Sequence, residues 1–413
     1  MSLVLRRVVV ICLCLLLLGL IAHNIRQTLP PSVVVIESGP VGGSYHDSAL
    51  RYAIRLEAAG IKTEIRANPQ SIQIIDNLEK GRPRVDIGFS VQSLNRAAHP
   101  NVASAGIIEL QPFFIVYNIG LGKVHSLVNL RGKRLVMPPE NSATAMIARV
   151  VLKLYGITEK NTRFVYLPIT QASEELKNGL HDAGFFMLAP ANQIIRSLLS
   201  VDHLFLLSLP ESIGISRQLD YLKASVLPLG SYDLIQNLPD TDLAVVGGLV
   251  NVMVRKDINP AVMYALLNAM KDTHEGQSIV SAKGEFPSMV GTALELHPLA
   301  AQWAKSGTPW VFDKLSPGLA SLSDKYWLFA LAILLLAEAY RVLRYFYEFI
   351  ALGATSTALR ILRFVNRRLS AGYTPGRLDL RLFGMAEDII AHESQDQKAK
   401  ALLEQIRPAM KRP

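Results

Sequence analysis

Cysteine is almost absent from this sequence. Only Cys12 and Cys14 occur among its 413 residues, and both lie in an apolar run near the N-terminus. The long region that follows therefore has no disulfide to support it. A chain of this length is expected to form two or three structural units, and the largest must be stabilised by its own hydrophobic core.

The central region also lacks an excess of positive charge. The formal net charge is +9, but residues 341–413 hold 13 Lys and Arg against 7 Asp and Glu, and the first 25 residues hold two arginines and no acid. A nucleic-acid-binding protein would carry its positive charge on its main folded domain. We therefore expect no nucleic acid among the partners.

Motifs for catalysis, nucleotide binding and metal binding are missing as well. Ser44, His46 and Asp47 are close in sequence, but their spacing at a helix start does not place a base on a nucleophile. The pair Gly42 and Gly43 has no lysine after it and does not fit G-x-G-x-x-G, which excludes both a P-loop and a dinucleotide loop. The scattered histidines without metal-ligand spacing are His125, His181, His203, His274 and His297. We therefore expect a protein that is not an enzyme and holds no metal or cofactor.

The first long apolar run is present at residues 8–22, directly after Arg6 and Arg7. It is slightly short for a membrane-spanning helix, which needs roughly 20 residues, and it resembles a secretory signal. No clear small-x-small cleavage site follows it. We predict that residues 1–26 form an uncleaved signal anchor, with a cleaved signal peptide as the alternative.

A second apolar run predicts a transmembrane helix at residues 325–345. Aromatic residues flank it, as they do at membrane interfaces; they are Tyr326, Trp327, Tyr340, Tyr345 and Tyr347. Arginines follow this run and precede the first one, so both termini are predicted to be cytoplasmic and residues 30–320 to lie outside. A buried helix in a soluble core is the alternative.

The outer region shows the alternation of strands and helices that is typical of an α/β fold. Residues 33–37, 62–67 and 84–90 read as strands, with helices at 47–59 and 71–81 between them. A second set of the same order begins after Gly122. The pattern predicts two α/β lobes built on parallel strands, lobe 1 at about residues 32–120 and 240–300 and lobe 2 at about 121–239, with a ligand cleft between them.

Each lobe has a helix start that could bind an anion. Gly42 and Gly43 allow a close backbone approach, and Ser44 with Asp47 fits a capping box. In lobe 2, Asn141 or Ser142 could cap the next helix, with Thr144 in its first turn. Free N–H groups and the helix dipole would then face the cleft. The alternatives are an ordinary tight turn and simple capping.

The predicted helices carry their apolar residues on one face. The apolar face of the first helix is predicted to hold Leu50, Ala53, Ile54 and Ala58. The buried face of the lobe 2 helix is predicted to hold Met146, Val150, Val151 and Leu154. A further loop, at residues 221–233, has a Pro-x-Gly turn before Tyr232.

Six short motifs follow one another over residues of about 32–320: "SGPVGGSY", "VDIGFS", "LVNLRGKRLVMPPENSATAM", "HDAGFFMLAPANQI", "VLPLGSY" and "HPLAAQW". In this order they resemble the motifs of the TAXI-type solute receptors of tripartite ATP-independent periplasmic (TRAP) transporters. The chain departs from the family at Gln70, Asn141 and Ala143, where the family has glycine. The C-terminal apolar run resembles a membrane-tethered subgroup.

This resemblance implies a two-lobed type II periplasmic-binding-protein fold in the bacterial inner membrane, with the main domain in the periplasm. It implies a small anionic organic solute, a carboxylate or acidic amino acid, as ligand, and TRAP permease membrane subunits as partners. The ligand-binding residues that we predict are Ser38, Gly42, Gly43, Ser44, Tyr45, Ser71, Asn141, Ser142, Thr144, Asp182 and Tyr232. A ligand sensor or interaction scaffold without a permease is the alternative.

The tail, residues 346–413, is predicted to be basic, cytoplasmic and helical. Leu359, Leu362, Val365 and Leu369 alternate with arginines, as in a helix that lies in the membrane interface. We therefore expect lipid contact through two spans and this interfacial helix. Residues 384–409 read as a helical segment that is either solvated or packs on itself.

Overall fold

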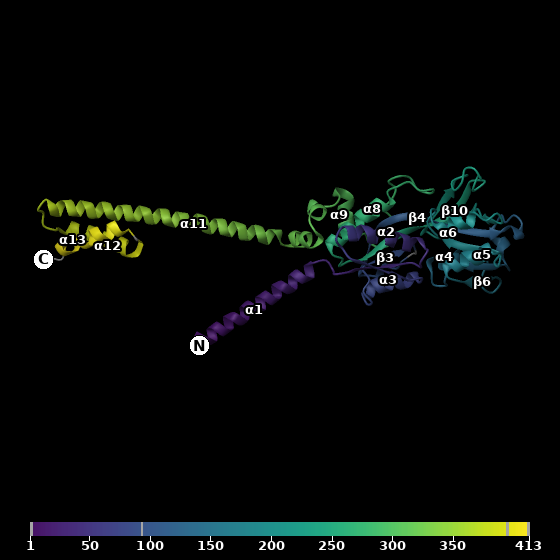
Figure 1. Ribbon diagram of the computed structural model, residues 1–413, viewed down its shortest axis with the longest axis horizontal. Coiled ribbons are helices and arrows are strands. Elements are labelled where there is room, and N and C mark those ends of the chain that lie inside the picture. Colours follow the sequence, from purple (N-terminus) through teal and green to yellow (C-terminus); the bar gives the residue numbers. More distant parts are fainter. Residues whose placement is uncertain (1–2, 92–93, 394–395, 411–413) are drawn as a thin grey trace. The chain divides into compact units, whose positions relative to one another are not determined.

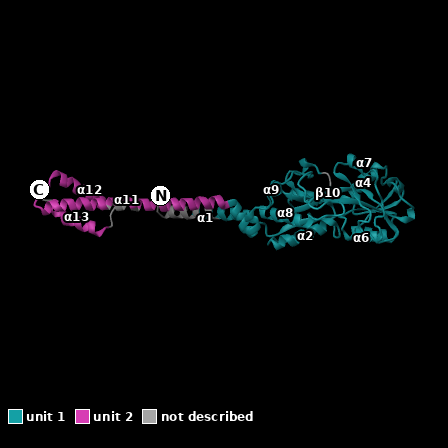
Figure 2. Ribbon diagram, turned by 90° about the horizontal axis from the view of Figure 1, so that it is seen from above, with its two compact units in different colours: residues 1–325 teal, residues 326–413 magenta. Residues whose placement is uncertain are grey.

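A computed structural model of the chain describes residues 3–91, 94–393 and 396–410. The chain divides into two compact units, residues 1–325 and residues 326–413 (Figure 2). The first unit contains the α/β domain, and the second contains a helical bundle.

The strands of the first unit form one sheet. Within the described residues they are β1 (Val34–Ser38), β2 (Thr63–Ala67), β3 (Ile87–Ser90), β4 (Val102–Asn118), β5 (Arg134–Met137), β6 (Arg163–Tyr166), β7 (Ala183–Met187), β8 (Leu204–Leu206), β9 (Leu222–Leu227) and β10 (Leu243–Arg255). Their order is β2-β1-β3-β10-β4-β7-β5-β6, with β8 beside β4 and β9 beside β10.

The helices follow the strands in alternation through most of this unit. They are α1 (Leu3–Thr28), α2 (Ser44–Ala58), α3 (Ser71–Lys80), α4 (Ala143–Leu154), α5 (Ile169–Lys177), α6 (Gln193–Leu199), α7 (Ser212–Gln218), α8 (Pro260–His274), α9 (Pro298–Ser306) and α10 (Trp310–Lys314), with short 3₁₀ turns at η1 (Arg96–Ala98), η2 (Ile119–Leu121) and η3 (Leu127–Leu130). Helix α11 (Pro317–Ser370) begins in the first unit, and α12 (Arg377–Glu393) and α13 (Gln397–Met410) belong to the second.

Two long strands, β4 and β10, connect the two halves of the domain. They pair with each other in antiparallel fashion, β10 also pairs with β3 and β9, and β4 pairs with β7 and β8. Strand β1 pairs in parallel with β2 and β3, and β5 pairs in parallel with β6 and β7. We call the β1–β3 half with α2, α3 and α8 lobe 1, and the β5–β8 half with α4–α6 lobe 2 (Figure 1).

The α/β class is confirmed, but the expectation of parallel strands alone is wrong. Every strand and helix predicted in the two lobes forms, whereas β4 and β10 make the sheet mixed. Nearly all residues of both strands are buried, because the sheet is covered on both faces. Strand β4 ends at Asn118 and β10 begins at Leu243, close to the positions where the predicted lobes meet.

The apolar faces of two helices were predicted with the wrong rotation. In α2, Ala53 is buried as predicted, but Ala58 is exposed and Leu50 and Ile54 are 46% and 67% exposed. Tyr52 and Leu56 are fully buried instead. In α4 the same error appears: Val150 and Leu154 are exposed, and Met146 is half-buried, whereas Val151 is buried as expected. Helix α2 packs its buried side against β1 and α8, so the tertiary contacts select this face over the one with the larger aliphatic side chains.

The second unit is a bundle formed by the end of α11 with α12 and α13. Its core contains Leu362, Val365, Phe383, Leu403 and Ile406, all buried. The predicted interfacial helix is therefore wrong for its central residues, because Leu362 and Val365 are covered by protein and not by lipid. The alternative of a tail that packs on itself is the one that the structure shows.

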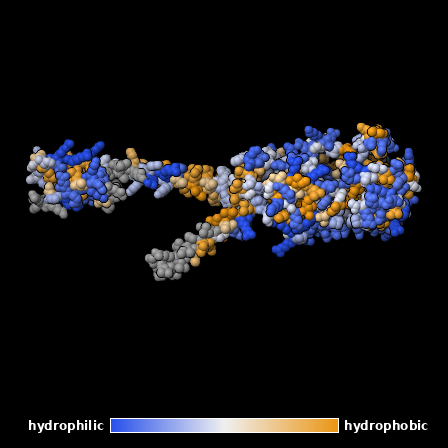
Figure 3. All heavy atoms as spheres, viewed as in Figure 1, coloured by the Kyte–Doolittle hydropathy of each residue, from blue (hydrophilic) through white to orange (hydrophobic). Residues whose placement is uncertain are grey.

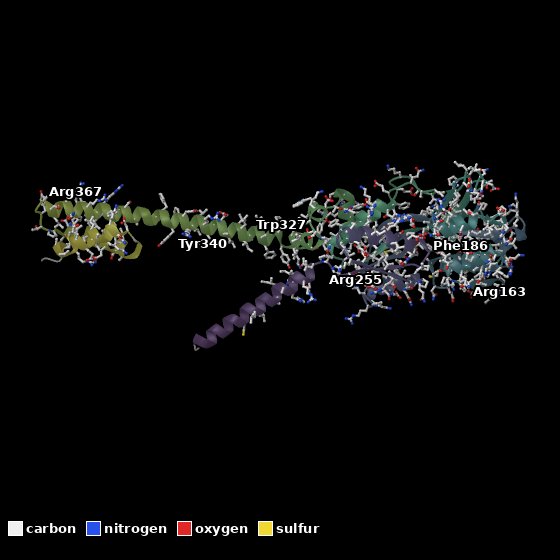
Figure 4. The ribbon with its side chains drawn as sticks, in the orientation of Figure 1. Arg163, Phe186, Arg255, Trp327, Tyr340 and Arg367 are labelled. Carbon is white, nitrogen blue, oxygen red and sulfur yellow. The ribbon has the colours of Figure 1, made fainter. Side chains whose placement is uncertain are left out.

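Helix α11 contains a segment, Pro317–Tyr347, that is long and apolar enough to cross a membrane, with a mean hydropathy of 1.7. In the most apolar stretch of 18 residues within this segment, no residue is buried by the rest of the protein. Along α11, hydrophobic side chains give way to hydrophilic ones (Figure 3). Trp327 and Tyr340 project from the same helix (Figure 4).

Candidate functional site

A small cavity between the lobes collects most of the predicted binding residues. This cleft pocket has a volume of about 40 Å³. The predicted residues that line it are Gly43, Ser44, Tyr45, Ser71, Ser142 and Thr144. Lobe 1 supplies the first four and lobe 2 the others, so the structure brings together segments that lie about 100 positions apart in sequence.

Four helices begin at the cleft pocket. Their first residues, Ser44 of α2, Ser71 of α3, Ala143 of α4 and Ile169 of α5, all line it. The first N–H groups of a helix have no partner within the helix, and the helix dipole is positive at that end. Among the described residues that line the pocket, none has a charged side chain. The polar environment therefore favours a negative group without any formal positive charge.

Hydrogen bonds across the cleft hold the lobes together. The Ala143 N–H donates to Ser71 Oγ at 3.0 Å, and the Ala189 N–H donates to Ser44 Oγ at 2.7 Å. The amide of Asn192 donates to the Gly42 carbonyl at 3.0 Å. A ligand pocket typically has a volume of about 300–1,000 Å³, far more than the volume of the cleft pocket. A solute could therefore enter only if these hydrogen bonds break and the lobes separate.

The predicted cap is wrong for α2 and confirmed for α4, where Ser142 is the N-cap. Helix α2 begins at Ser44, and Gly43 occupies the N-cap without a side-chain cap. The predicted capping box is therefore wrong: Ser44 Oγ accepts from lobe 2, and Asp47 accepts from Asn192 at 3.0 Å. In lobe 2, Ser142 is the cap and accepts from the Ala145 N–H at 3.2 Å.

Five predicted binding residues do not line the cleft pocket; they are Ser38, Gly42, Asn141, Asp182 and Tyr232. Ser38 is buried at the end of β1, where its hydroxyl bonds to His46 Nδ1 at 2.9 Å. Gly42 has φ +84, which suits glycine, and contributes only its carbonyl to the cross-lobe bond. Asn141 is exposed, beside the cap but outside the pocket.

Asp182 and Tyr232 lie outside the cleft pocket and contact other parts of the protein. The Asp182 carboxylate accepts from the Arg134 N–H at 2.7 Å and from its guanidinium at 3.0 Å. Burial acts to raise the pKa of Asp182, but the bonds from Arg134 outweigh it, so the pKa lies below its usual value. Tyr232 packs against a cluster of buried apolar residues that includes Phe186, Leu198 and Val245. Burial raises the pKa of its hydroxyl.

Sequence reasoning missed the polar pair Glu109 and Gln111 on β4. Gln111 is 2% exposed and lines the cleft pocket, and its amide donates to Glu109 at 2.6 Å. Burial raises the pKa of Glu109 to about 7. The signal in the sequence was a Glu-Leu-Gln triplet within an otherwise apolar stretch, which places two polar groups on one face of a buried strand.

A second cavity, the hinge pocket, lies on the other side of the α2 N-terminus. It has a volume of about 190 Å³ and shares Ser44 with the cleft pocket. Its charged or titratable lining residues are Asp47, Arg51, Glu109 and His274. Burial, with a smaller effect of Arg51, lowers the pKa of His274 to about 4, so this imidazole is neutral at neutral pH.

The geometry contains no catalytic relay among the residues that sequence proximity had suggested. His46 bonds to Ser38, Ser44 accepts from lobe 2, and Asp47 bonds to Asn192. Within the described ranges, no group of three or more His, Cys, Asp or Glu is arranged to hold a metal ion. The described residues that line the cleft pocket offer hydroxyl, amide and backbone groups.

The domain is similar to several solved structures, two of which are named as binding proteins. An ancestral arginine-binding protein bound to arginine has 14% identity and a TM-score of 0.39, covering 60% of this chain and 94% of that one. The alkanesulfonate-binding protein of Xanthomonas axonopodis pv. citri, bound to MOPS, has 16% identity and a TM-score of 0.37, covering 59% and 74%. A protein from Bordetella bronchiseptica RB50 has 14% identity and a TM-score of 0.43, covering 72% and 99%. These similarities are too distant to indicate a ligand.

A match to a family model covers most of the α/β domain. The model describes the NMT1-like family and matches residues 36–302. This range runs from β1 to α9 and includes every residue that lines the cleft pocket. More than half of the chain is matched, and the chain therefore belongs to the NMT1-like family.

Proposed function

We propose that this protein is a membrane-anchored extracytoplasmic receptor that binds a small anionic organic solute between its two lobes. The observation that carries the proposal is the convergence of four helix N-termini, from both lobes, on one uncharged pocket. Such a site stabilises negative charge by N–H groups and helix dipoles. A carboxylate or an acidic amino acid has the charge that suits it.

The lobe arrangement supports a receptor that closes on its ligand. Among the strands that the structure describes, only β4 and β10 continue from one lobe into the other. The remaining contacts at the cleft include single hydrogen bonds such as that from the Ala143 N–H to Ser71 Oγ. A net bond of this kind contributes about 0.5–1.5 kcal/mol. Opening is therefore possible at modest cost, and a ligand that bonds to both lobes would favour the closed form.

The finer assignment, a TAXI-type receptor of a TRAP transporter, rests on the motifs in family order. "SGPVGGSY" forms the end of β1 and the start of α2, and "PPENSATAM" forms the start of α4. Both segments line the cleft pocket. Transport would require separate permease subunits, because two predicted spans are too few to form a permease of this kind.

The membrane topology is a testable part of this proposal. Residues 1–26 and 325–345 are proposed to span the bacterial inner membrane, with the binding domain in the periplasm and both termini in the cytoplasm. Reporter fusions should place residue 200 outside and residue 400 inside. Protection of residue 200 from protease in spheroplasts would contradict this topology.

The ligand can be sought directly. We expect a solute to co-purify with the protein, to be identified by mass spectrometry, and to carry at least one carboxylate. Adding this solute back should raise the melting temperature of the full chain in detergent, by mass action. A co-purified neutral sugar that has the same effect would contradict the anionic assignment.

A ligand sensor is the second candidate function. The observation in its favour is that α11 is one continuous helix of 54 residues from the end of the binding domain into the C-terminal bundle. Ligand closure could be passed along such a helix to a cytoplasmic partner. Solute uptake that depends on this protein in intact cells would favour the transport receptor, and uptake that is unchanged by its deletion would favour the sensor.

A further inference from the structure

A large cavity lies at the end of lobe 1 where the chain enters and leaves the domain. This basal pocket has a volume of about 820 Å³. It is lined by the residues that follow α1, by the turn between α3 and β3, by the turn between β10 and α8, and by the first part of α11. It shares no residue with the cleft pocket or the hinge pocket.

Asn259 joins the chain entry and the chain exit at this pocket. Its amide donates to the Thr28 carbonyl at 2.9 Å, and its carbonyl oxygen accepts from the Ser321 hydroxyl at 3.1 Å. The Lys325 ammonium donates to Thr28 Oγ1 at 2.9 Å. The ends of both predicted anchors are therefore attached to lobe 1 and define one wall of the pocket.

The lining of the basal pocket is positively charged. Its basic residues are Lys80, Arg82, Arg84, Arg255 and Lys325, and they outnumber the three lining acids. Arg84 bonds to Asp86 and Arg255 bonds to Asp257, so these two pairs are internally compensated. Lys80 and Arg82 are exposed, and within the described residues neither has a carboxylate partner.

The position of Lys325 relates the pocket to the depth of a membrane. Lys325 precedes Trp327 by two helical residues, which is about 3 Å along the helix axis. Tryptophan is enriched at the level of the lipid headgroups. If α11 spans the membrane, as the proposed function requires, Lys325 and the wall of the basal pocket lie at that level.

We propose that the basal pocket binds the phosphate headgroup of an acidic glycerophospholipid from the outer leaflet. Lys80 and Arg82 supply the donors for the phosphate, because Arg84 and Arg255 are already bonded to carboxylates. The volume of about 820 Å³ is in the range of ligand pockets. Basic pockets beside membrane spans bind anionic headgroups through the same charges. Such a lipid would hold lobe 1 against the membrane and leave lobe 2 to move.

The test uses the full chain purified with lipid. Native mass spectrometry would measure retention of phosphatidylglycerol against phosphatidylcholine in the wild type and in the double variant Lys80→Gln/Arg82→Gln. A matched control, Lys153→Gln/Arg163→Gln, removes two exposed basic residues of lobe 2; Figure 4 shows Arg163 at the end of the unit away from Arg255. We expect the wild type and the control to retain phosphatidylglycerol in preference to phosphatidylcholine. In the test variant, the ratio of the two retained lipids should fall about tenfold.

Other results would overturn the proposal. If both double variants lose the preference for phosphatidylglycerol to the same extent, the preference is a general effect of surface charge. If the wild type has no such preference, the basal pocket is not a headgroup site. If inorganic phosphate raises the melting temperature of the lipid-free protein in a Lys80- and Arg82-dependent way while phosphatidylglycerol is not preferred, the pocket binds free phosphate and not lipid. Carbonate extraction separates this failure from that of the proposed function: a protein released by carbonate is not membrane-spanning, whereas a retained protein without lipid preference refutes only the headgroup site.

Discussion

The cleft pocket and the hinge pocket share Ser44 but differ in charge. Four helix N-termini and no charged side chain surround the first, whereas Asp47, Arg51, Glu109 and His274 line the second. The difference separates two tasks. The uncharged pocket leaves its positive potential available to an anionic ligand, and the charged pocket contains groups whose protonation depends on their burial.

The largest effect is expected from Gly43→Val, which changes the cleft pocket alone. A Cβ at residue 43 would lie 3.0 Å from the Pro40 carbonyl oxygen, and the rest of the valine side chain would occupy part of a cavity of about 40 Å³. We expect the affinity for solute to fall more than a hundredfold, about 2.7 kcal/mol, with a loss of about 1–3 kcal/mol in stability from overpacking. Calorimetric titration and circular dichroism would measure both.

The control for this variant is Gly214→Val in α7. A Cβ at residue 214 would meet no described atom within 4 Å, so both affinity and stability should be nearly unchanged. Unchanged affinity in a folded Gly43→Val protein would mean that the glycine turn is only structural and that the ligand binds elsewhere.

The second effect concerns the hinge pocket and depends on pH. The pKa of Glu109 is raised to about 7 in the folded protein, from an ordinary value of 4.5. Between these values the folded state binds more protons than the unfolded state, so stability falls as the pH rises from about 4.5 to 7. Glu109→Gln should remove this fall and make the protein more stable than wild type at pH 8, by roughly 1–3 kcal/mol.

His274 provides an internal reference for that measurement. Its pKa is lowered to about 4, so its contribution to stability rises with pH from about 4 to 6.5 and is present in both proteins. Unfolding of the full chain in detergent at pH 5, 6, 7 and 8 should therefore show a difference between wild type and variant that grows with pH. If the difference in stability between wild type and Glu109→Gln stays constant from pH 5 to pH 8, the pKa of Glu109 is not raised by burial.

The smallest effect is expected from Ser44→Ala, which removes the acceptor for the Ala189 N–H. Loss of this bond leaves a donor without its partner in the closed form, at a cost of about 1–2 kcal/mol. The affinity should then fall by up to about tenfold, because closure is less favourable. Ser197→Ala is the control, since Ser197 bonds only within α6, to the Ile194 carbonyl. If Ser44→Ala lowers the affinity more than Gly43→Val does, the ligand is bound mainly by the Ser44 hydroxyl and not by backbone N–H groups.

The sequence predicted the order of the elements well because each depends on local patterns. The apolar run of β1, the glycines before α2 and the Ser142 cap of α4 are short-range signals. The mixed sheet was not predictable in this way, because the pairing of β4 with β10 joins residues more than 130 positions apart. The rotation of α2 was missed because the spacing of Leu50 and Ile54 indicates one apolar face, whereas the packing of α2 against β1 and α8 buries the face with Tyr52 and Leu56.

The candidate site shows the same limit. Gly43, Ser44 and Ser142 were identified by helix starts and Ser71 by the family resemblance, and all four line one pocket. Asp182 was included because of its motif, yet Arg134 occupies its carboxylate. Gln111 was missed because the sequence around a polar residue in a strand does not show which distant segments pack against it. In the fold, the residues that line the cleft pocket with Gln111 come from other segments.

The central claim, an anion held by helix N-termini, is tested most directly by comparing charged and uncharged ligands of the same shape. We would titrate the full chain in detergent with succinate and glutamate, and with their amides succinamide and glutamine, while following the melting temperature. The account predicts that a carboxylate ligand raises the melting temperature and binds at least tenfold more tightly than its amide, about 1.4 kcal/mol, and that Gly43→Val abolishes the difference. Stabilisation by the amides to the same extent, or only by neutral sugars or cations, would contradict it.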